Sequence, residues 1–111
     1  MRLNAEDPER AFAPSPGTVT TWHVPGGPGV RLDSHMQAGG RIPPNYDSMI
    51  GKLLVHAPTR EEAIQRMRRA LDEMSVEGVK TTLDLHRKIL RDAYFVEGKY
   101  STKFLDVMLA T

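Results

Sequence analysis

Cysteine is absent from the 111 residues of this chain, and no apolar run reaches the length of a membrane-spanning helix. The first absence excludes disulfides and thiolate chemistry, and it suits a cytoplasmic protein. Neither sign of charge dominates, since the formal net charge is +1, so attraction to nucleic acid or to an anionic membrane is not expected. We therefore expect a single soluble domain whose partners include no nucleic acid and no membrane.

The common signatures of catalytic and metal sites are also missing. No Gly-x-x-x-x-Gly-Lys-Ser/Thr loop is present to cradle a nucleotide phosphate. The four histidines do not have the spacing of metal ligands, so we expect no metal site. These histidines are His23, His35, His56 and His86.

Turn-forming residues punctuate the first half of the chain. Six of the eight prolines and seven of the nine glycines lie between residues 14 and 51. Residues 18–24 are rich in β-branched and aromatic residues, and in residues 30–36 apolar residues partly alternate with polar ones. The turn sequence of residues 25–29 separates the two segments. We predict that these two segments pair as a β-hairpin. The apolar run within residues 48–56 predicts a third, well-buried strand.

Capping residues and helical spacing characterise the second half. Thr59 and Glu62 form a Thr-x-x-Glu capping box before apolar residues at helical spacing, which predicts a helix over residues 60–74. Thr81 or Thr82 is expected to cap a second helix that ends near residue 92. The residues of this second helix expected to face inward are Leu83, Leu85, His86, Ile89 and Leu90.

The predicted fold over residues 1–111 is one α+β domain. It has a small antiparallel β-sheet that includes a β-hairpin, covered by two α-helices. Near the beginning, Asp7 followed by Pro8 fits a helix N-cap with proline at the first helical position.

Four blocks of the sequence occur together in one family, in this order and at these spacings. They are Arg2-Leu-Asn-Ala-Glu-Asp-Pro8, Pro14-Ser-Pro-Gly17, Pro25-Gly-Gly-Pro-Gly-Val-Arg31 and Tyr46-Asp-Ser-Met-Ile-Gly-Lys-Leu53. With these blocks, the chain resembles the C-terminal domain of biotin carboxylases, and in particular the bacterial acetyl-CoA carboxylase type. The first and the last block are the most specific of the four.

The resemblance implies an enzyme, an ATP-dependent ligase that acts in fatty acid biosynthesis. Such an enzyme uses MgATP and bicarbonate to carboxylate N1′ of the biotin that is attached to biotin carboxyl carrier protein. The arginine that opens the first block contacts biotin and bicarbonate and stabilises the biotin enolate, which implies that Arg2 is catalytic. Tyr46 and Asp47 resemble the segment that lines the same cavity on the biotin side.

The resemblance also implies a homodimer. By their positions in the motifs, Arg31 and Arg66 match arginines of the dimer interface. Pro28 replaces a phenylalanine that occupies this interface in some members of the family. This departure weakens the expectation of a strong dimer.

Only one domain of the enzyme is covered by the resemblance. The ATP-grasp domain, which binds MgATP, would precede Arg2 in the family. We therefore expect an excised domain that binds no cofactor by itself, is inactive alone and requires the rest of biotin carboxylase as a partner. The alternative is a stand-alone dimerisation module, which would need Arg31 and Arg66 but would have no need of Arg2, Tyr46 or Asp47.

Lys52 suggests a third function, that of a biotin carrier. In carriers the modified lysine stands between two methionines at a hairpin tip, whereas Gly51 and Leu53 flank Lys52 within an apolar run. A strand lysine that snorkels or pairs with an acidic residue is the better interpretation.

Overall fold

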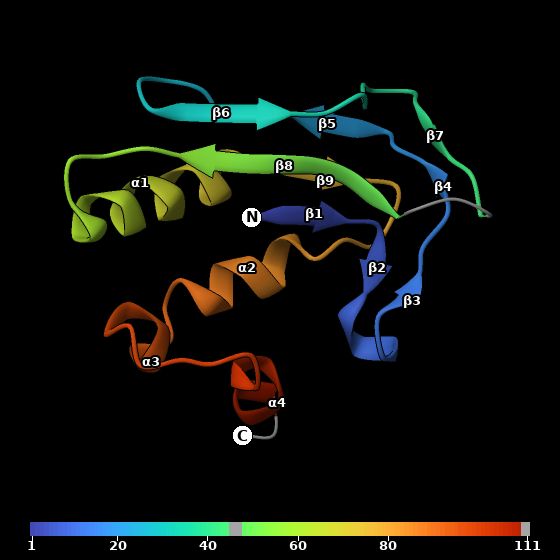
Figure 1. Ribbon diagram of the computed structural model, residues 1–111. Coiled ribbons are helices and arrows are strands. Elements are labelled where there is room, and N and C mark those ends of the chain that lie inside the picture. The colour runs from blue at the N-terminus through green and yellow to red at the C-terminus, as the bar shows by residue number, and fades with distance from the viewer. Residues whose placement is uncertain (45–47, 110–111) are drawn as a thin grey trace.

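The computed structural model describes residues 1–44 and 48–109. A three-stranded antiparallel sheet in the order β1–β8–β6 forms one layer, and two helices lie beneath it in the view of Figure 1. The strands are β1 (Arg2–Asn4), β6 (Val30–Asp33) and β8 (Met49–Val55), and the helices are α1 (Arg60–Glu73) and α2 (Leu83–Ile89). The predicted α+β architecture, with a small antiparallel sheet and two covering helices, is confirmed.

Three two-stranded antiparallel pairs surround this layer. They are β2 (Glu6–Asp7) with β3 (Ala13–Pro14), β4 (Gly17–Thr18) with β7 (Arg41–Ile42), and β5 (Thr21–His23) with β9 (Ser75–Glu77). Between β2 and β3 the chain makes a single 3-10 turn, η1 (Pro8–Arg10). Asp7 caps this turn, because its Oδ1 accepts a hydrogen bond from the Glu9 amide at 3.0 Å. The predicted N-cap at Asp7 is therefore confirmed.

The predicted hairpin between residues 18–24 and 30–36 is wrong. Both segments form strands, but β5 pairs with β9 and β6 pairs with β8. The turn at residues 25–29 therefore carries the chain from one sheet to another. The physical reason is that β8, with seven residues, accepts β6 along one edge and β1 along the other. The local consecutive pair is instead β2 with β3, in which Asp7 lies opposite Ala13.

The two principal helices begin near the predicted residues. The Thr59 hydroxyl accepts a hydrogen bond from the Glu62 amide at 3.2 Å, which confirms Thr59 as the N-cap of α1. Thr82 is the residue at the N-cap position of α2, but its side chain makes no cap hydrogen bond. Its hydroxyl contacts β1 instead, and this contact matters for the site described below.

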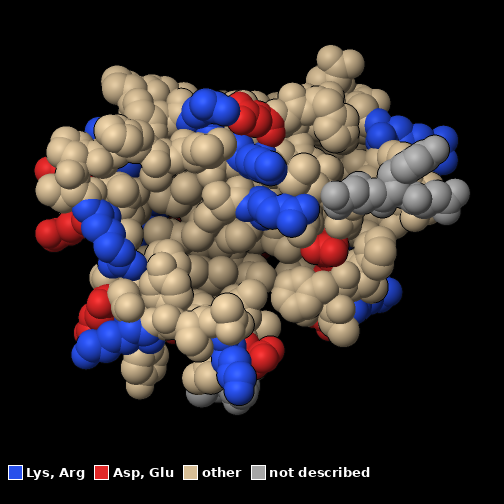
Figure 2. All heavy atoms as spheres, in the orientation of Figure 1, with Lys and Arg blue, Asp and Glu red and all other residues tan. Residues whose placement is uncertain are grey.

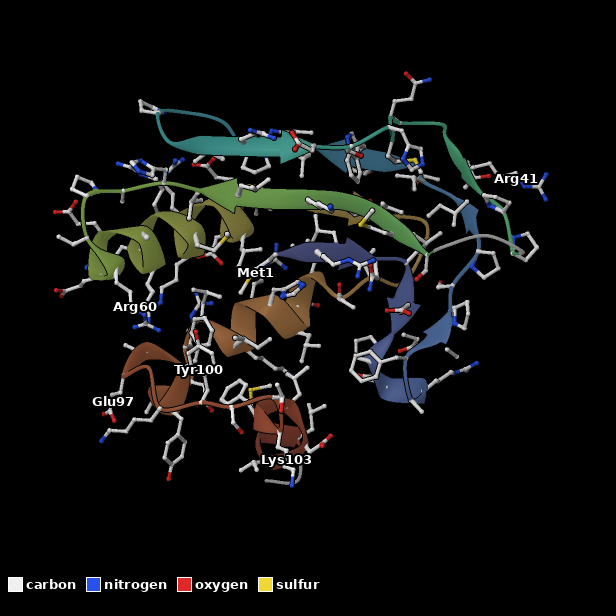
Figure 3. All side chains as sticks on the ribbon, viewed as in Figure 1. Met1, Arg41, Arg60, Glu97, Tyr100 and Lys103 are labelled. Carbon is white, nitrogen blue, oxygen red and sulfur yellow. The ribbon has the colours of Figure 1, made fainter. Side chains whose placement is uncertain are left out.

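Two short helices that were not predicted follow α2. These are α3 (Ala93–Val96) and α4 (Phe104–Leu109). Arg60 points from the first turn of α1 toward α3 and donates hydrogen bonds to the carbonyls of Phe95, at 2.6 Å, and Val96, at 2.5 Å (Figure 3). The Phe95 ring stacks on Tyr100 with 5.0 Å between ring centroids. These contacts attach the C-terminal segment to α1.

The hydrophobic core lies between the main sheet and the two principal helices. Its most buried members come from distant segments, including Leu3 of β1, Leu53 of β8, Leu71 of α1 and Leu90 after α2. Burial of such side chains makes the largest favourable contribution to folding, at about 25 cal/mol for each Å² of apolar surface. Of the five residues predicted to face inward on the second helix, four are buried, and the fifth, His86, is partly buried.

Candidate active-site surface

Arg2 lies on an edge strand of the main sheet, directly opposite Lys52 of β8. The neighbouring pair, Met1 and Leu53, is the hydrogen-bonded one, because the Leu53 amide donates to the Met1 carbonyl at 2.8 Å. In an antiparallel ladder hydrogen-bonded and non-hydrogen-bonded pairs alternate, and the latter bring side chains closer together. Arg2 and Lys52 therefore form a close cross-strand pair, and both side chains are exposed.

This pair continues as a row of charged groups across the sheet. Asp33 of β6 lies opposite Lys52 on its other side, so that Asp33, Lys52 and Arg2 face the same way. Figure 2 shows basic groups, with acidic atoms beside them, over β6, β8 and β1. The two adjacent cations create a positive potential at the β1 end of the row, which suits a ligand oxygen that carries or develops negative charge.

Arg31 and Asp33 form an ion pair at the other end of this row. Arg31 donates two hydrogen bonds to the Asp33 carboxylate, at 2.7 and 2.9 Å. These bonds and the attraction of Lys52 lower the pKa of Asp33, and the same pair raises the pKa of Arg31. Both groups are exposed, so the pair contributes little to stability. Its fixed geometry orients the Arg31 guanidinium.

The outer edge of β1 is covered by α2. The Thr82 hydroxyl accepts a hydrogen bond from the Asn4 amide at 3.1 Å, and the Thr82 amide donates to the Asn4 carbonyl at 3.0 Å. His86 Nε2 lies 2.6 Å from the Arg2 carbonyl. Burial of the imidazole lowers the pKa of His86, although its hydrogen bond to Arg2 acts in the opposite direction. Because its pKa is lowered, His86 is neutral near pH 7. A carbonyl oxygen can only accept a hydrogen bond, so the neutral ring carries its proton on Nε2.

The three residues predicted for the dimer interface lie around one end of β6. The Arg66 side chain donates a hydrogen bond to the His56 carbonyl, and the His56 amide donates to the Gly29 carbonyl at 2.9 Å. Gly29 has φ = 71° and lies so close to the Arg66 guanidinium that a side chain would collide with it. Pro28 precedes this glycine. The hollow beside them measures 310 Å³ and is lined by Gly29, Val30, Arg31, Leu54, Val55 and His56.

Tyr46 and Asp47 lie outside the described residues, so their predicted place near Arg2 stays a prediction. Within residues 1–44 and 48–109, no three or more His, Cys, Asp or Glu side chains are grouped so as to hold a metal ion. No helix among these residues is long and apolar enough to cross a membrane.

Comparison with known proteins places this surface in a family. Residues 1–107 match the family described as the biotin carboxylase C-terminal domain. The chain belongs to the biotin carboxylase C-terminal domain family. The biotin carboxylase of Pseudomonas aeruginosa is 50% identical over 108 residues, which are 97% of this chain and 24% of that protein. The chloroplastic biotin carboxylase of Arabidopsis thaliana is 50% identical over 104 residues, which are 94% of this chain and 19% of that protein. The chain thus spans about a quarter or less of the length of these curated relatives.

Solved structures of biotin carboxylases have the same fold as this domain. The biotin carboxylase domain dimer of Hydrogenobacter thermophilus 2-oxoglutarate carboxylase, in complex with MgADP, ADP and bicarbonate, superposes with a TM-score of 0.95. It is 46% identical, and the match covers 97% of this chain and 24% of that one. The biotin carboxylase subunit of a pyruvate carboxylase gives the same TM-score at 44% identity, over 98% of this chain and 24% of that one.

Two features of the biotin carboxylase C-terminal domain surface were missed from sequence. One is the pairing of Arg2 with Lys52, because residues in different strands become neighbours only through the register of the sheet. The other is the contact of His86 with Arg2, which are 84 positions apart. Helical spacing did indicate that His86 faces inward, but a spacing pattern does not identify the partner.

Proposed function

We propose that this domain serves a cytoplasmic biotin carboxylase, an ATP-dependent ligase. The reaction uses bicarbonate and MgATP to carboxylate biotin on biotin carboxyl carrier protein. We assign it to the acetyl-CoA carboxylase type and to fatty acid biosynthesis on the four sequence blocks described above. The ATP-grasp domain and the carrier protein are the partners that this proposal requires, and the isolated chain is expected to be inactive.

The position of Arg2 is the observation that carries the proposal. Its exposed side chain extends from an edge strand beside Lys52, in a domain whose relatives are biotin carboxylases. Removal of the N1′ proton places negative charge on the ureido oxygen of biotin, and a guanidinium directed at that oxygen stabilises the charge. A guanidinium suits this role because it remains ionised at every physiological pH. Tyr46 and Asp47 are proposed to line the same side of the cavity.

A domain exchange tests this function. The C-terminal part of P. aeruginosa biotin carboxylase that matches this chain is replaced by residues 1–111, and bicarbonate-dependent ATP hydrolysis is measured with free biotin. We expect biotin-dependent turnover, and we expect Arg2→Ala to lower it about 100-fold, the effect of losing one donor to a developing oxyanion. Arg10→Ala is the matched control, because the Arg10 side chain is 83% exposed and lies outside the sheet.

Two outcomes would contradict the proposal. The first is a folded, exchanged enzyme that has no biotin-dependent turnover. The second is an Arg2→Ala variant that turns over as fast as the Arg10→Ala control. Circular dichroism of each variant establishes that it is folded.

The second candidate function is a stand-alone dimerisation module. The cluster of Pro28, Arg31 and Arg66 beside the 310 Å³ hollow favours it. Arg31→Glu would place two carboxylates side by side at Asp33 and repel a partner, so a dimer of the isolated chain should dissociate. Sedimentation velocity measures this directly. A dimer of the isolated chain that persists in Arg31→Glu would show that the interface lies elsewhere.

A further inference from the structure

The outer edge of β1 needs hydrogen-bond partners, because β1 is an edge strand. Its other edge is paired with β8, which leaves the Arg2 carbonyl and the main-chain groups of Asn4 directed away from the sheet. No further strand among the described residues pairs with this edge. In Figure 1, α2 runs directly beneath β1. Side chains and an amide at the beginning of α2 therefore take the place of a fourth strand.

Thr82 and His86 divide these contacts between them. Thr82 bonds to both main-chain groups of Asn4, and its hydroxyl lies 3.5 Å from the Arg2 carbonyl. At 2.6 Å, the hydrogen bond from His86 is the shorter of the two contacts to that carbonyl. The two residues are one helical turn apart on α2, so they lie on the same face of the helix. His86 thus supplies the main hydrogen bond that holds the Arg2 carbonyl.

The ring of His86 has an unusual feature. Its second nitrogen, Nδ1, is buried and has no hydrogen-bond partner among the described residues. A leucine would fill this space without burying a polar atom, so core packing by itself does not explain a histidine here. What a histidine adds over leucine is the Nε2–H donor that reaches the Arg2 carbonyl.

We propose that His86 is a positioning residue, which fixes the main chain of Arg2 so that the Arg2 guanidinium meets the ureido oxygen of biotin. This inference rests on the proposed function. The Arg2 side chain begins at the Cα atom next to the held carbonyl, so a tilt of that peptide is amplified along the long side chain. Misplacement of a catalytic group by about 1 Å costs on the order of 100-fold in rate.

Three variants separate this role from a general effect on packing. His86→Leu removes the donor, whereas His86→Gln keeps an N–H group that reaches the same carbonyl. His23→Leu is the matched control. His23 lies on a different sheet from Arg2, and its Nδ1 is 2.8 Å from the Glu73 carbonyl. Both histidines contact a main-chain carbonyl, and only one of these carbonyls belongs to Arg2.

The first measurement uses the isolated chain and does not depend on catalysis. We expect His86→Leu to shift the NMR resonance of the Arg2 carbonyl carbon and that of the following Leu3 amide. His86→Gln should restore both resonances, and His23→Leu should leave them unchanged. If His86→Leu leaves both resonances in place, the positioning role is overturned.

The second measurement uses the domain-exchanged enzyme. We expect His86→Leu to lower kcat/KM for biotin about tenfold and to leave KM for ATP unchanged. The kcat/KM values of His86→Gln and His23→Leu should stay within about twofold of that of the parent, which is the domain-exchanged enzyme without a further substitution. If Arg2→Ala lowers turnover about 100-fold but His86→Leu matches His23→Leu, the positioning role fails while the proposed function stands. If the parent does not use biotin, the proposed function fails, and the NMR measurement alone decides whether His86 holds Arg2.

Discussion

Arg87 on α2 bonds to the C-terminal end of α1, and its removal tests whether it stabilises that end of the helix. Arg87 makes three hydrogen bonds to the carbonyls of Leu71 and Met74, at distances of 2.7 to 3.0 Å. Both residues are buried, and α1 has no basic residue of its own in its last turn. The guanidinium therefore satisfies carbonyls at the negative end of the helix dipole.

Arg87→Met keeps the apolar stem of the side chain but lacks the guanidinium, so every donor is removed. Each buried carbonyl left without a partner costs about 1–3 kcal/mol. With two such carbonyls and partial access of water, because the Arg87 side chain is 28% exposed, we expect a loss of about 3 kcal/mol. For a domain of this size this corresponds to a decrease in Tm of about 15 °C. Thermal unfolding followed by circular dichroism measures it.

Arg91→Met is the control for Arg87→Met. Arg91 pairs with Asp72 at 3.1 Å, and both side chains are about half exposed. Such a pair contributes up to about 1 kcal/mol. If the two variants lose the same stability, or if Arg87→Met loses less than about 1 kcal/mol, the account of Arg87 as the cap of α1 is wrong.

Three further predictions concern the backbone and the effect of pH. Gly78→Ala should lower the free energy of unfolding in urea by more than about 2 kcal/mol, because Gly78 has φ = 102° and a Cβ would collide with the Thr18 carbonyl. Gly39 has φ = 85° but faces open space, so Gly39→Ala should lower it by only about 1 kcal/mol. Equal losses would contradict the steric explanation. Ala11 has φ = 54°, a left-handed conformation that glycine adopts at lower cost, so Ala11→Gly should raise the free energy of unfolding by about 0.5–1 kcal/mol. A decrease in the same assay would contradict this. Burial lowers the pKa of His86 below its usual 6.5, so the stability that the neutral ring provides is present above pH 6.5 and is lost as the pH falls through the folded pKa. His86→Gln should lack this component, and equal pH profiles of unfolding free energy for both proteins would exclude it.

Several features of the fold could be predicted from sequence because their causes are local. The cap of α1 at Thr59, the turn that begins at Asp7 and Pro8, and the buried strand β8 each depend on residues within a few positions of one another. Membership of the biotin carboxylase C-terminal domain family is also carried by the sequence, through four blocks at fixed spacing. The resemblance singled out Arg2 for the same reason.

Strand pairing and the surroundings of Arg2 were decided by tertiary structure. The turn at residues 25–29 has the composition of a hairpin, yet β5 and β6 bond to strands that follow much later in the chain. Local turn preferences are weak compared with the burial and hydrogen bonds gained when a short strand joins β8 or β9. The contacts of Arg2 with Lys52 and His86 arise in the same way. The sequence by itself identified the candidate catalytic arginine, and only the folded chain determined what lies beside it and what holds it in place.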